Sequence, residues 1–196
     1  MMRIVVLCIC LIALSACDSA RQQFNAALRQ LQAQNIEPAV ITLSSLAENG
    51  YAPAQFRLGL LLLYGRGFTQ DPQRAAYWLD KAARQDEVGA QWVLARMHGN
   101  GVGMPQSPAQ ALRWYQRLAE RGFVPAQYQL AILYDQGQGI AKDIGKAAYW
   151  FQQAAANGHP QAMMTLVQAY RKGLLGLPVD AEQAAYWQAK AKPKSF

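Results

Sequence analysis

Residues 54–78, AQFRLGLLLLYGRGFTQDPQRAAYW, return in altered form three more times along the chain, at intervals of 36 residues. Three kinds of residue stay in register: Ala54, Ala90, Ala126 and Ala162; Leu58, Leu94, Leu130 and Leu166; Gly65, Gly101, Gly137 and Gly173. After Gly173 the fourth copy runs one residue late, so the segment 173–176 is expected to be a loop that absorbs an insertion. A period of this length is typical of solenoids, in which each copy is one supersecondary unit.

Each copy predicts two helices, called helix A and helix B, that are joined by a turn. Helix A spans roughly residues 53–64 in the first copy, where apolar residues have helical spacing. It ends at Gly65, because glycine adopts the positive φ of a helix C-cap without strain. Helix B begins at Asp71-Pro72, since aspartate caps free N–H groups and proline fits the first turn. Equivalent capping residues stand at Ser107, Asp143 and Asp180.

Small and large residues alternate in a way that suits stacked helix pairs. Ala54 and Gly59 allow neighbouring helices to approach closely, and one tryptophan per helix B is expected to fill the core between pairs. These tryptophans are Trp78, Trp114, Trp150 and Trp187. One pair cannot bury its apolar face alone, whereas a stack of pairs can. The predicted fold class is therefore all-α, a helix-turn-helix repeat solenoid of about four full repeats.

The segments before and after the repeats are assigned separately. Residues 20–50 contain one amphipathic pattern and a second segment in the register of helix B, but they lack the Gly-x-Gly turn. They are expected to form an irregular N-terminal capping repeat. The repeat solenoid is assigned to residues 51–192, and a short basic tail to residues 193–196.

The first residues have the features of a secretion signal. Arg3 is followed by an uncharged apolar run at 4–14, which is too short to cross a hydrocarbon core of ~30 Å as a helix. The run leads into Leu14-Ser15-Ala16-Cys17, which resembles a bacterial lipobox. This resemblance implies a signal peptide at residues 1–16, acylation of Cys17, and a lipidated terminus with a short linker at 17–19. An ordinary cleavage site with a chance cysteine is the alternative.

Such an N-terminus implies a lipoprotein of the bacterial cell envelope that faces the periplasm. Asp18 resembles an inner-membrane retention signal, and the outer membrane is the alternative location. No disulfide is expected after cleavage, because two cysteines leave with the signal and Cys17 carries the lipid.

Composition and charge restrict the partners. The chain is 52% hydrophobic and 16% charged, which excludes a disordered chain. A net charge of +7 suits nucleic acid, an anionic membrane surface or an acidic protein. Export disfavours nucleic acid, so another protein is the predicted partner, with the membrane contacted through the lipid anchor.

Several cations gather near the C-terminus. They either stabilise helix ends and form part of a solvated tail, or they contact anionic lipid or an acidic partner. They are Arg171, Lys172, Lys190, Lys192 and Lys194.

Residues suited to catalysis or metal binding are sparse. The two histidines, His98 and His159, stand far apart without a cysteine or carboxylate cluster beside them, so neither a zinc site nor a catalytic triad is expected. The Gly-x-Gly segments lack the Gly-Lys-Ser/Thr of a phosphate-binding loop and recur along the repeats, so we interpret them as turns. The sequence therefore predicts no enzyme, no metal and no cofactor.

The repeated motif resembles that of the Sel-one-like repeat family, whose members are relatives of the tetratricopeptide repeats. The match in the first copy is carried by residues 54–59, 65–67, 71 and 75–78, and the resemblance covers about residues 37–190. Later copies have Ala95, Ala131 and Val167 where the family has the glycine found at Gly59. The resemblance implies a right-handed α/α superhelix whose A helices line a concave face, and a role in protein interaction.

Two rows of residues on the A helices form the candidate partner-binding surface. By analogy with tetratricopeptide repeats, both rows are expected to face the concave groove. The first row is Phe56, Trp92, Tyr128 and Met164, and the second is Leu60, Arg96, Ile132 and Gln168. Rigid aromatic side chains beside an arginine are typical of protein-binding hot spots. The alternative interpretation is that the aromatic row packs between consecutive A helices.

Several functions fit this fold, because a fold does not select one by itself. The resemblance implies either a scaffold in an envelope assembly or an immunity protein that neutralises a secreted toxin. A cell-wall glycan-binding module that uses exposed tyrosines at Tyr77, Tyr115 and Tyr149 is a further alternative. A hydrolase is a remote one, because no paired carboxylates stand at a plausible site.

Overall fold

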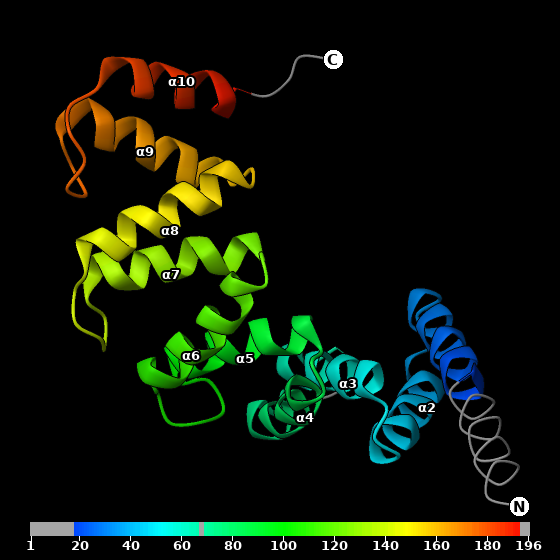
Figure 1. The fold of residues 1–196 in the computed structure, drawn as a ribbon. Helices are drawn as coiled ribbons and strands as arrows, with labels where there is room; N and C mark the ends of the chain where they lie inside the picture. Colours follow the sequence, from blue (N-terminus) through cyan, green and yellow to red (C-terminus); the bar gives the residue numbers. More distant parts are fainter. Residues whose placement is uncertain (1–17, 67–68, 193–196) are drawn as a thin grey trace, which may run out of the picture. The chain divides into compact units, whose positions relative to one another are not determined.

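A computed structural model describes residues 18–66 and 69–192 of the chain. The predicted signal peptide at 1–16, the predicted acylation site Cys17 and the tail at 193–196 lie outside the described residues. All regular secondary structure in the described part is helical (Figure 1). The predicted all-α class is therefore confirmed.

Helix pairs follow one another along the chain. Residues 18–32 are helical and precede α2 (Ile36–Glu48). The four pairs after them are α3 (Ala52–Tyr64) with α4 (Pro72–Arg84), α5 (Val88–Asn100) with α6 (Pro108–Glu120), α7 (Val124–Gln136) with α8 (Ile144–Ala156), and α9 (Pro160–Lys172) with α10 (Ala181–Ala191). Helices α3, α5, α7 and α9 are the A helices, and they begin 36 residues apart. The predicted four repeats and N-terminal unit are thus present.

Local signals set the helix ends at the predicted places. The carboxylates of Asp71 and Asp143 accept hydrogen bonds of 2.9 Å from the third residue of the B helix that follows. Gly137 takes a left-handed φ of 67° after α7, and its N–H donates to the carbonyl of Leu133. The first A helix was expected at 53–64 and runs from Ala52 to Tyr64.

The one-residue insertion lies in the loop between α9 and α10. Helix α9 keeps the 36-residue register, whereas the N-cap of α10, Asp180, comes 37 residues after Asp143. The longer loop contains Leu175 with a φ of 57°, a backbone conformation that non-glycine residues rarely adopt. The insertion was therefore placed correctly from the sequence.

The described residues divide into two compact units. One unit contains the residues up to Val93 together with Val102–Met104, and the other contains Leu94–Gly101 and the residues from Pro105 onward. In the first unit, α2 packs against α3 and α3 against α4. In the second unit, each helix from α6 to α10 packs against the next one along the chain, and α7 to α10 lie side by side in Figure 1.

Residues that keep the repeat register form the core of each unit. The alanines Ala54, Ala90, Ala126 and Ala162 are 0% exposed, and the matching leucines are at most 3% exposed. Each fully buried leucine contributes ~1.5–3 kcal/mol relative to exposure. In the first unit, a Cβ on Gly59 would lie 2.7 Å from Cγ of Leu79, so glycine permits the close approach of α3 and α4.

The tryptophans of the B helices are less enclosed than the sequence predicts. Trp187 is buried, whereas Trp78, Trp114 and Trp150 are half-buried. Trp78 and Trp150 each meet the ring of the preceding exposed tyrosine edge to face, with ring centroids 5.0 Å apart. These side chains therefore bridge the core and the outer surface of the B helices.

Candidate functional site

Both predicted rows lie on the A helices, and none of their eight members is fully buried. The half-buried members are Phe56, Leu60, Trp92, Tyr128 and Ile132, and the exposed members are Arg96, Met164 and Gln168. Phe56, Leu60 and Trp92 belong to the first unit, and the other five belong to the second. Each unit thus presents its own part of the rows to solvent.

Phe56 lies against the start of the next A helix in the first unit. A Cβ on Gly89 would come 2.6 Å from Cζ of Phe56, so the phenyl ring occupies the space that a side chain at residue 89 would need. Gly89 stands near the N-terminus of α5, and Phe56 is on α3. The ring therefore packs between α3 and α5, two consecutive A helices, while part of it stays exposed.

Tyr128 makes the corresponding contact in the second unit. Its ring on α7 stacks on the His159 imidazole, with centroids 4.2 Å apart and planes 15° apart, and meets Phe151 edge to face at 5.8 Å. His159 is the N-cap of α9, and its Nδ1 accepts a 3.4 Å hydrogen bond from the backbone N–H of Ala162. Burial lowers the pKa of His159, because the imidazolium form is less well solvated there.

The aromatic row thus has a packing role, as the alternative interpretation expected. Phe56 and Tyr128 each contact the N-terminal end of the A helix in the following repeat. Both rings are half-buried, so packing fixes each ring while part of it stays exposed. Such fixed, partly exposed rings suit recognition of a partner. The part that the rows play in binding stays a prediction.

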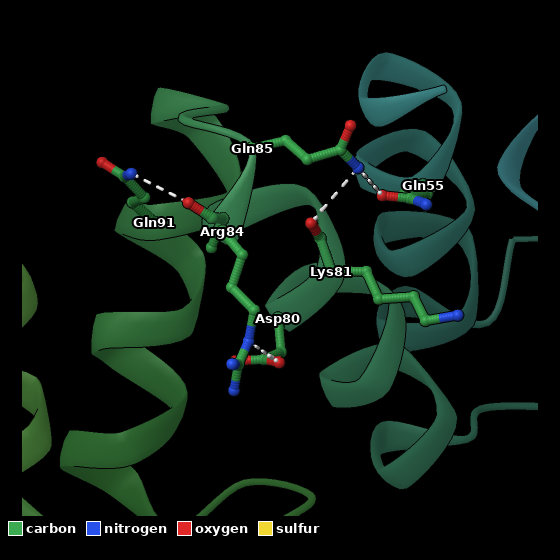
Figure 2. A network of polar contacts seen from close by, with 7 residues as sticks. Gln55, Asp80, Lys81, Arg84, Gln85 and Gln91 are labelled. Carbon is green, nitrogen blue, oxygen red and sulfur yellow. Dashed lines mark hydrogen bonds and ion pairs between the residues drawn. The ribbon is translucent and has the colours of Figure 1, made fainter. Parts of the chain in front are cut away.

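Buried glutamines form a polar feature that the sequence analysis missed. Gln55 and Gln91 follow the leading alanine of α3 and α5 and are at most 3% exposed. The amide nitrogen of Gln55 donates to the carbonyl of Ala47, and that of Gln91 donates to the carbonyl of Ala83, each at 3.0 Å. Figure 2 shows Gln91 bonded in this way, together with a 2.8 Å hydrogen bond from Nε2 of Gln85 to Oε1 of Gln55.

The same arrangement recurs in the second unit. Nε2 of Gln127 donates to the carbonyl of Ala119 at 3.2 Å, and its Oε1 accepts from the Asn157 side chain at 3.0 Å. These bonds join the end of one B helix to the next A helix and then to the end of that repeat's own B helix. The repeated Ala-Gln-aromatic triplet was the available signal, and Met163 interrupts it in the fourth repeat.

The predicted set of exposed tyrosines is wrong at Tyr115, which is only 6% exposed. Tyr115 stands 36 residues after the buried Leu79 and takes its place in the core, so its register differs from that of Tyr77. Burial raises the pKa of Tyr115 to about 12, although the Arg96 charge opposes the rise. The exposed tyrosines on B helices include Tyr77, Tyr149 and Tyr186, which are half exposed and share one repeat position.

No group of three or more histidine, cysteine or acidic side chains in the described residues is arranged to hold a metal ion. Over residues 18–66 and 69–192, no helix combines the length and the apolar character needed to cross a bilayer.

Comparison with known proteins agrees with this architecture. The Sel1 repeat model matches residues 52–87, 88–123, 124–159 and 161–192. A Sel1 repeat protein from Oxalobacter formigenes has a similar structure, with a TM-score of 0.82 and 31% identity over 88% of this chain and 72% of that one. A protective antigen of uropathogenic Escherichia coli, c5321, displays an SLR fold and is 35% identical, with a TM-score of 0.73. The match covers 78% of this chain and 32% of the antigen. None of the curated proteins in the comparison matches the sequence.

The matched segments cover more than half of the sequence and coincide with the four helix pairs. This chain belongs to the Sel1 repeat family. It has the stacked helix-pair fold of that family, which is a protein-interaction fold.

Proposed function

We propose that this protein is a bacterial envelope lipoprotein that binds another protein through its A helices. One observation carries the proposal: the two rows keep solvent-exposed surface at the same positions of every repeat, although most of their side chains are apolar. Neighbouring apolar residues on the same helices, such as Leu58 and Leu130, are buried. Apolar side chains that stay exposed at regular intervals are typical of an interaction surface.

The second unit provides the most accessible part of this surface. Met164 is 48% exposed, and Arg96 and Gln168 are also exposed. Methionine adapts its shape to a partner, and arginine offers several donors in a fixed fork. The net charge of +7 favours a partner with an acidic surface.

Capture from solubilised envelopes tests the proposal. We expect a C-terminally tagged protein to bring down one main partner, and the triple variant Arg96→Ala, Met164→Ala, Gln168→Ala to lose it. The control variant Tyr149→Ala, Tyr186→Ala removes exposed side chains from the B helices of the same unit and should keep the partner. Equal capture by both variants would contradict binding at the A helices.

Acylation of Cys17 is the second part of the proposal. The lipobox-like segment 14–17 supports it, and so does the apolar run before it. Cells that are fed labelled palmitate should label the protein, and Cys17→Ser should remove the label. The control Cys8→Ser changes one of the two cysteines in the predicted signal peptide and should leave the label in place. Label in the Cys17→Ser protein would show that another residue is modified.

The partner's identity then separates two roles. An immunity protein would capture a toxin, and its deletion would make cells sensitive to siblings that secrete that toxin. A scaffold would capture components of an envelope assembly, and its deletion would impair that assembly without such sensitivity.

A glycan-binding role keeps one supporting observation. Tyr77, Tyr149 and Tyr186 are exposed, and each packs edge to face on the tryptophan beside it. Lys190 also lies over the Tyr186 ring, with its Nζ 4.7 Å from the ring centroid. If cell-wall fragments bind the purified protein and Tyr149→Ala, Tyr186→Ala abolishes this binding, the ligand is a glycan.

A further inference from the structure

The loop between α9 and α10 differs from the equivalent loop of the third repeat in its exposed side chains. Leu174 stands where the third repeat has Gln138, and Val179 stands where it has Lys142. Leu174 is 48% exposed and Val179 is 71% exposed. Two loop positions are therefore exposed and polar in the third repeat but exposed and apolar in the fourth.

A third aliphatic side chain joins these two. Ile144, the first residue of α8, is 43% exposed, and its Cγ2 would lie 3.7 Å from a Cβ on Gly176 in the loop. Cγ2 of Val179 would lie 3.3 Å from a Cβ on Gly173, so the two ends of the loop are close together. We call Ile144, Leu174 and Val179 the apolar loop patch. In Figure 1 the loop projects beyond the ends of α9 and α10.

Cations replace neutral or acidic residues at the base of the same loop. Helix α9 ends with Arg171 and Lys172, both exposed, where helix α7 ends with Asp135 and Gln136. Nη2 of Arg171 donates a 2.6 Å hydrogen bond to Oε1 of Gln188 on α10, which is a neutral group. The fourth repeat thus combines an apolar loop with two exposed cations, Arg171 and Lys172, at the end of the helix before it.

Two aspartates near the loop cap helix N-termini, and a third acidic residue, Glu182, is exposed in the first turn of α10. The Asp180 carboxylate accepts a 2.9 Å hydrogen bond from the N–H of Gln183, and Asp143 accepts one of 2.9 Å from the N–H of Lys146. The positive end of each helix dipole also stabilises these carboxylates. In the third repeat, Lys142 and Lys146 are more than half exposed, at 56% and 60% of their side chains, and they pair with Asp135 and Asp143.

We infer that the apolar loop patch inserts into the interface of an anionic lipid bilayer, with Arg171 and Lys172 against the headgroups. Aliphatic side chains gain free energy at the acyl boundary, and adjacent cations are attracted by anionic headgroups. Arginine and lysine also extend their charged ends to the headgroup level while their stems cover apolar surface. The inference stands on this loop alone and requires neither partner binding at the A helices nor acylation of Cys17.

Hydrogen exchange measured by mass spectrometry on the full chain tests the inference. The chain is mixed with phosphatidylcholine vesicles that contain or lack phosphatidylglycerol, and exchange is followed over residues 173–180. The test variant Leu174→Gln, Val179→Lys carries the residues of the third repeat. The control Ile41→Gln removes another aliphatic side chain, 66% exposed, from α2. All three proteins share residues 1–17, so differences between them report on the loop.

We expect vesicles with phosphatidylglycerol to slow exchange in the loop of the parent and of Ile41→Gln but not of the test variant. Replacing Arg171 and Lys172 with glutamine should weaken vesicle binding roughly fivefold for each cation removed. Unchanged exchange on anionic vesicles, or equal slowing on vesicles without phosphatidylglycerol, would overturn the inference. So would slowing that needs no vesicles and rises with protein concentration, because a second copy would then cover the patch.

Discussion

Gly139, in the turn between α7 and α8, has a φ of 70°, and a Cβ built there would overlap Cβ of Pro108 at the start of α6. The residue therefore combines a left-handed backbone with close contact between consecutive repeats. We expect Gly139→Ala to lower the free energy of unfolding by about 2–4 kcal/mol, measured by urea denaturation.

Gly122 supplies the matched control for this substitution. It has a φ of 82°, but no atom lies within 4 Å of a Cβ built there. Gly122→Ala should therefore cost only the backbone strain, about 1 kcal/mol. Equal losses in the two variants would show that the contact with Pro108 does not set the distance between repeats.

Gln127 tests the buried glutamines. Its side chain is 4% exposed and bonds both the Ala119 carbonyl and the Asn157 amide. Gln127→Leu removes both side-chain hydrogen bonds, although the Ala119 carbonyl keeps its 3.0 Å bond from the N–H of Gly122. Each lost bond costs about 0.5–1.5 kcal/mol, so the free energy of unfolding should fall by about 1–3 kcal/mol. Gln129→Leu, on the same helix and half-buried, should change it by less than about 0.5 kcal/mol. If Gln127→Leu leaves the free energy of unfolding unchanged, water replaces the hydrogen bonds that the glutamine makes.

At the scale of single elements, α9 depends on a titratable N-cap. The neutral His159 imidazole accepts the hydrogen bond from Ala162, whereas protonation removes this acceptor and places a cation at the helix N-terminus. Burial holds the pKa of His159 below its value in the unfolded chain, which is about 6.5. The unfolded chain therefore takes up the proton first, and stability contributed by neutral His159 is lost as the pH falls below about 6.5.

His159→Asn isolates this effect, because asparagine caps a helix without titrating. The free energy of unfolding of the parent should fall more steeply than that of the variant between pH ~7 and pH ~5. The difference between the two curves removes the contribution of other groups. Parallel curves would show that His159 does not couple protonation to the stability of α9.

Helix boundaries could be predicted because their causes are local. Asp71, Gly65 and Pro72 act on backbone groups within four residues, so the sequence alone places the ends of the first pair. The exposure of Tyr115 was mistaken because it was grouped with Tyr77 by type, whereas its repeat register matches Leu79. The glutamine bonds join residues 8 and 30 positions apart, which only the packed repeats bring together.

The candidate site was predictable only in part. Register alone placed Phe56, Tyr128 and Met164 at the same position of three A helices, and the structure has them there on α3, α7 and α9. The stacking of Tyr128 on His159 could not be foreseen, because it depends on how one A helix meets the next. Repeat register therefore predicted the positions of these residues but not the packing that holds their side chains.

At the scale of the whole molecule, a stack must present a polar surface where its packing stops. Gln188 on α10 and Lys192 at its C-cap replace Phe151 and Ala155 of the third repeat, and both are exposed. Gln188→Phe, Lys192→Ala should therefore expose an apolar face and increase self-association, measured by sedimentation velocity.

Gln183→Phe is the control, because it adds an aromatic side chain at another exposed position of α10. This variant should sediment like the parent. Association of both variants to the same extent would show that any added apolar side chain suffices, and that the identity of Gln188 and Lys192 does not matter.

Binding at the A helices is the central claim, and calorimetric titration of the purified protein with its captured partner tests it most directly. Arg96, Met164 and Gln168 are exposed in the second unit, so the triple alanine variant should keep its fold and raise the Kd at least about tenfold, or about 1.4 kcal/mol. Tyr149→Ala, Tyr186→Ala should leave the Kd unchanged. An unchanged Kd in the triple variant, or a larger loss in the tyrosine variant, would contradict the claim.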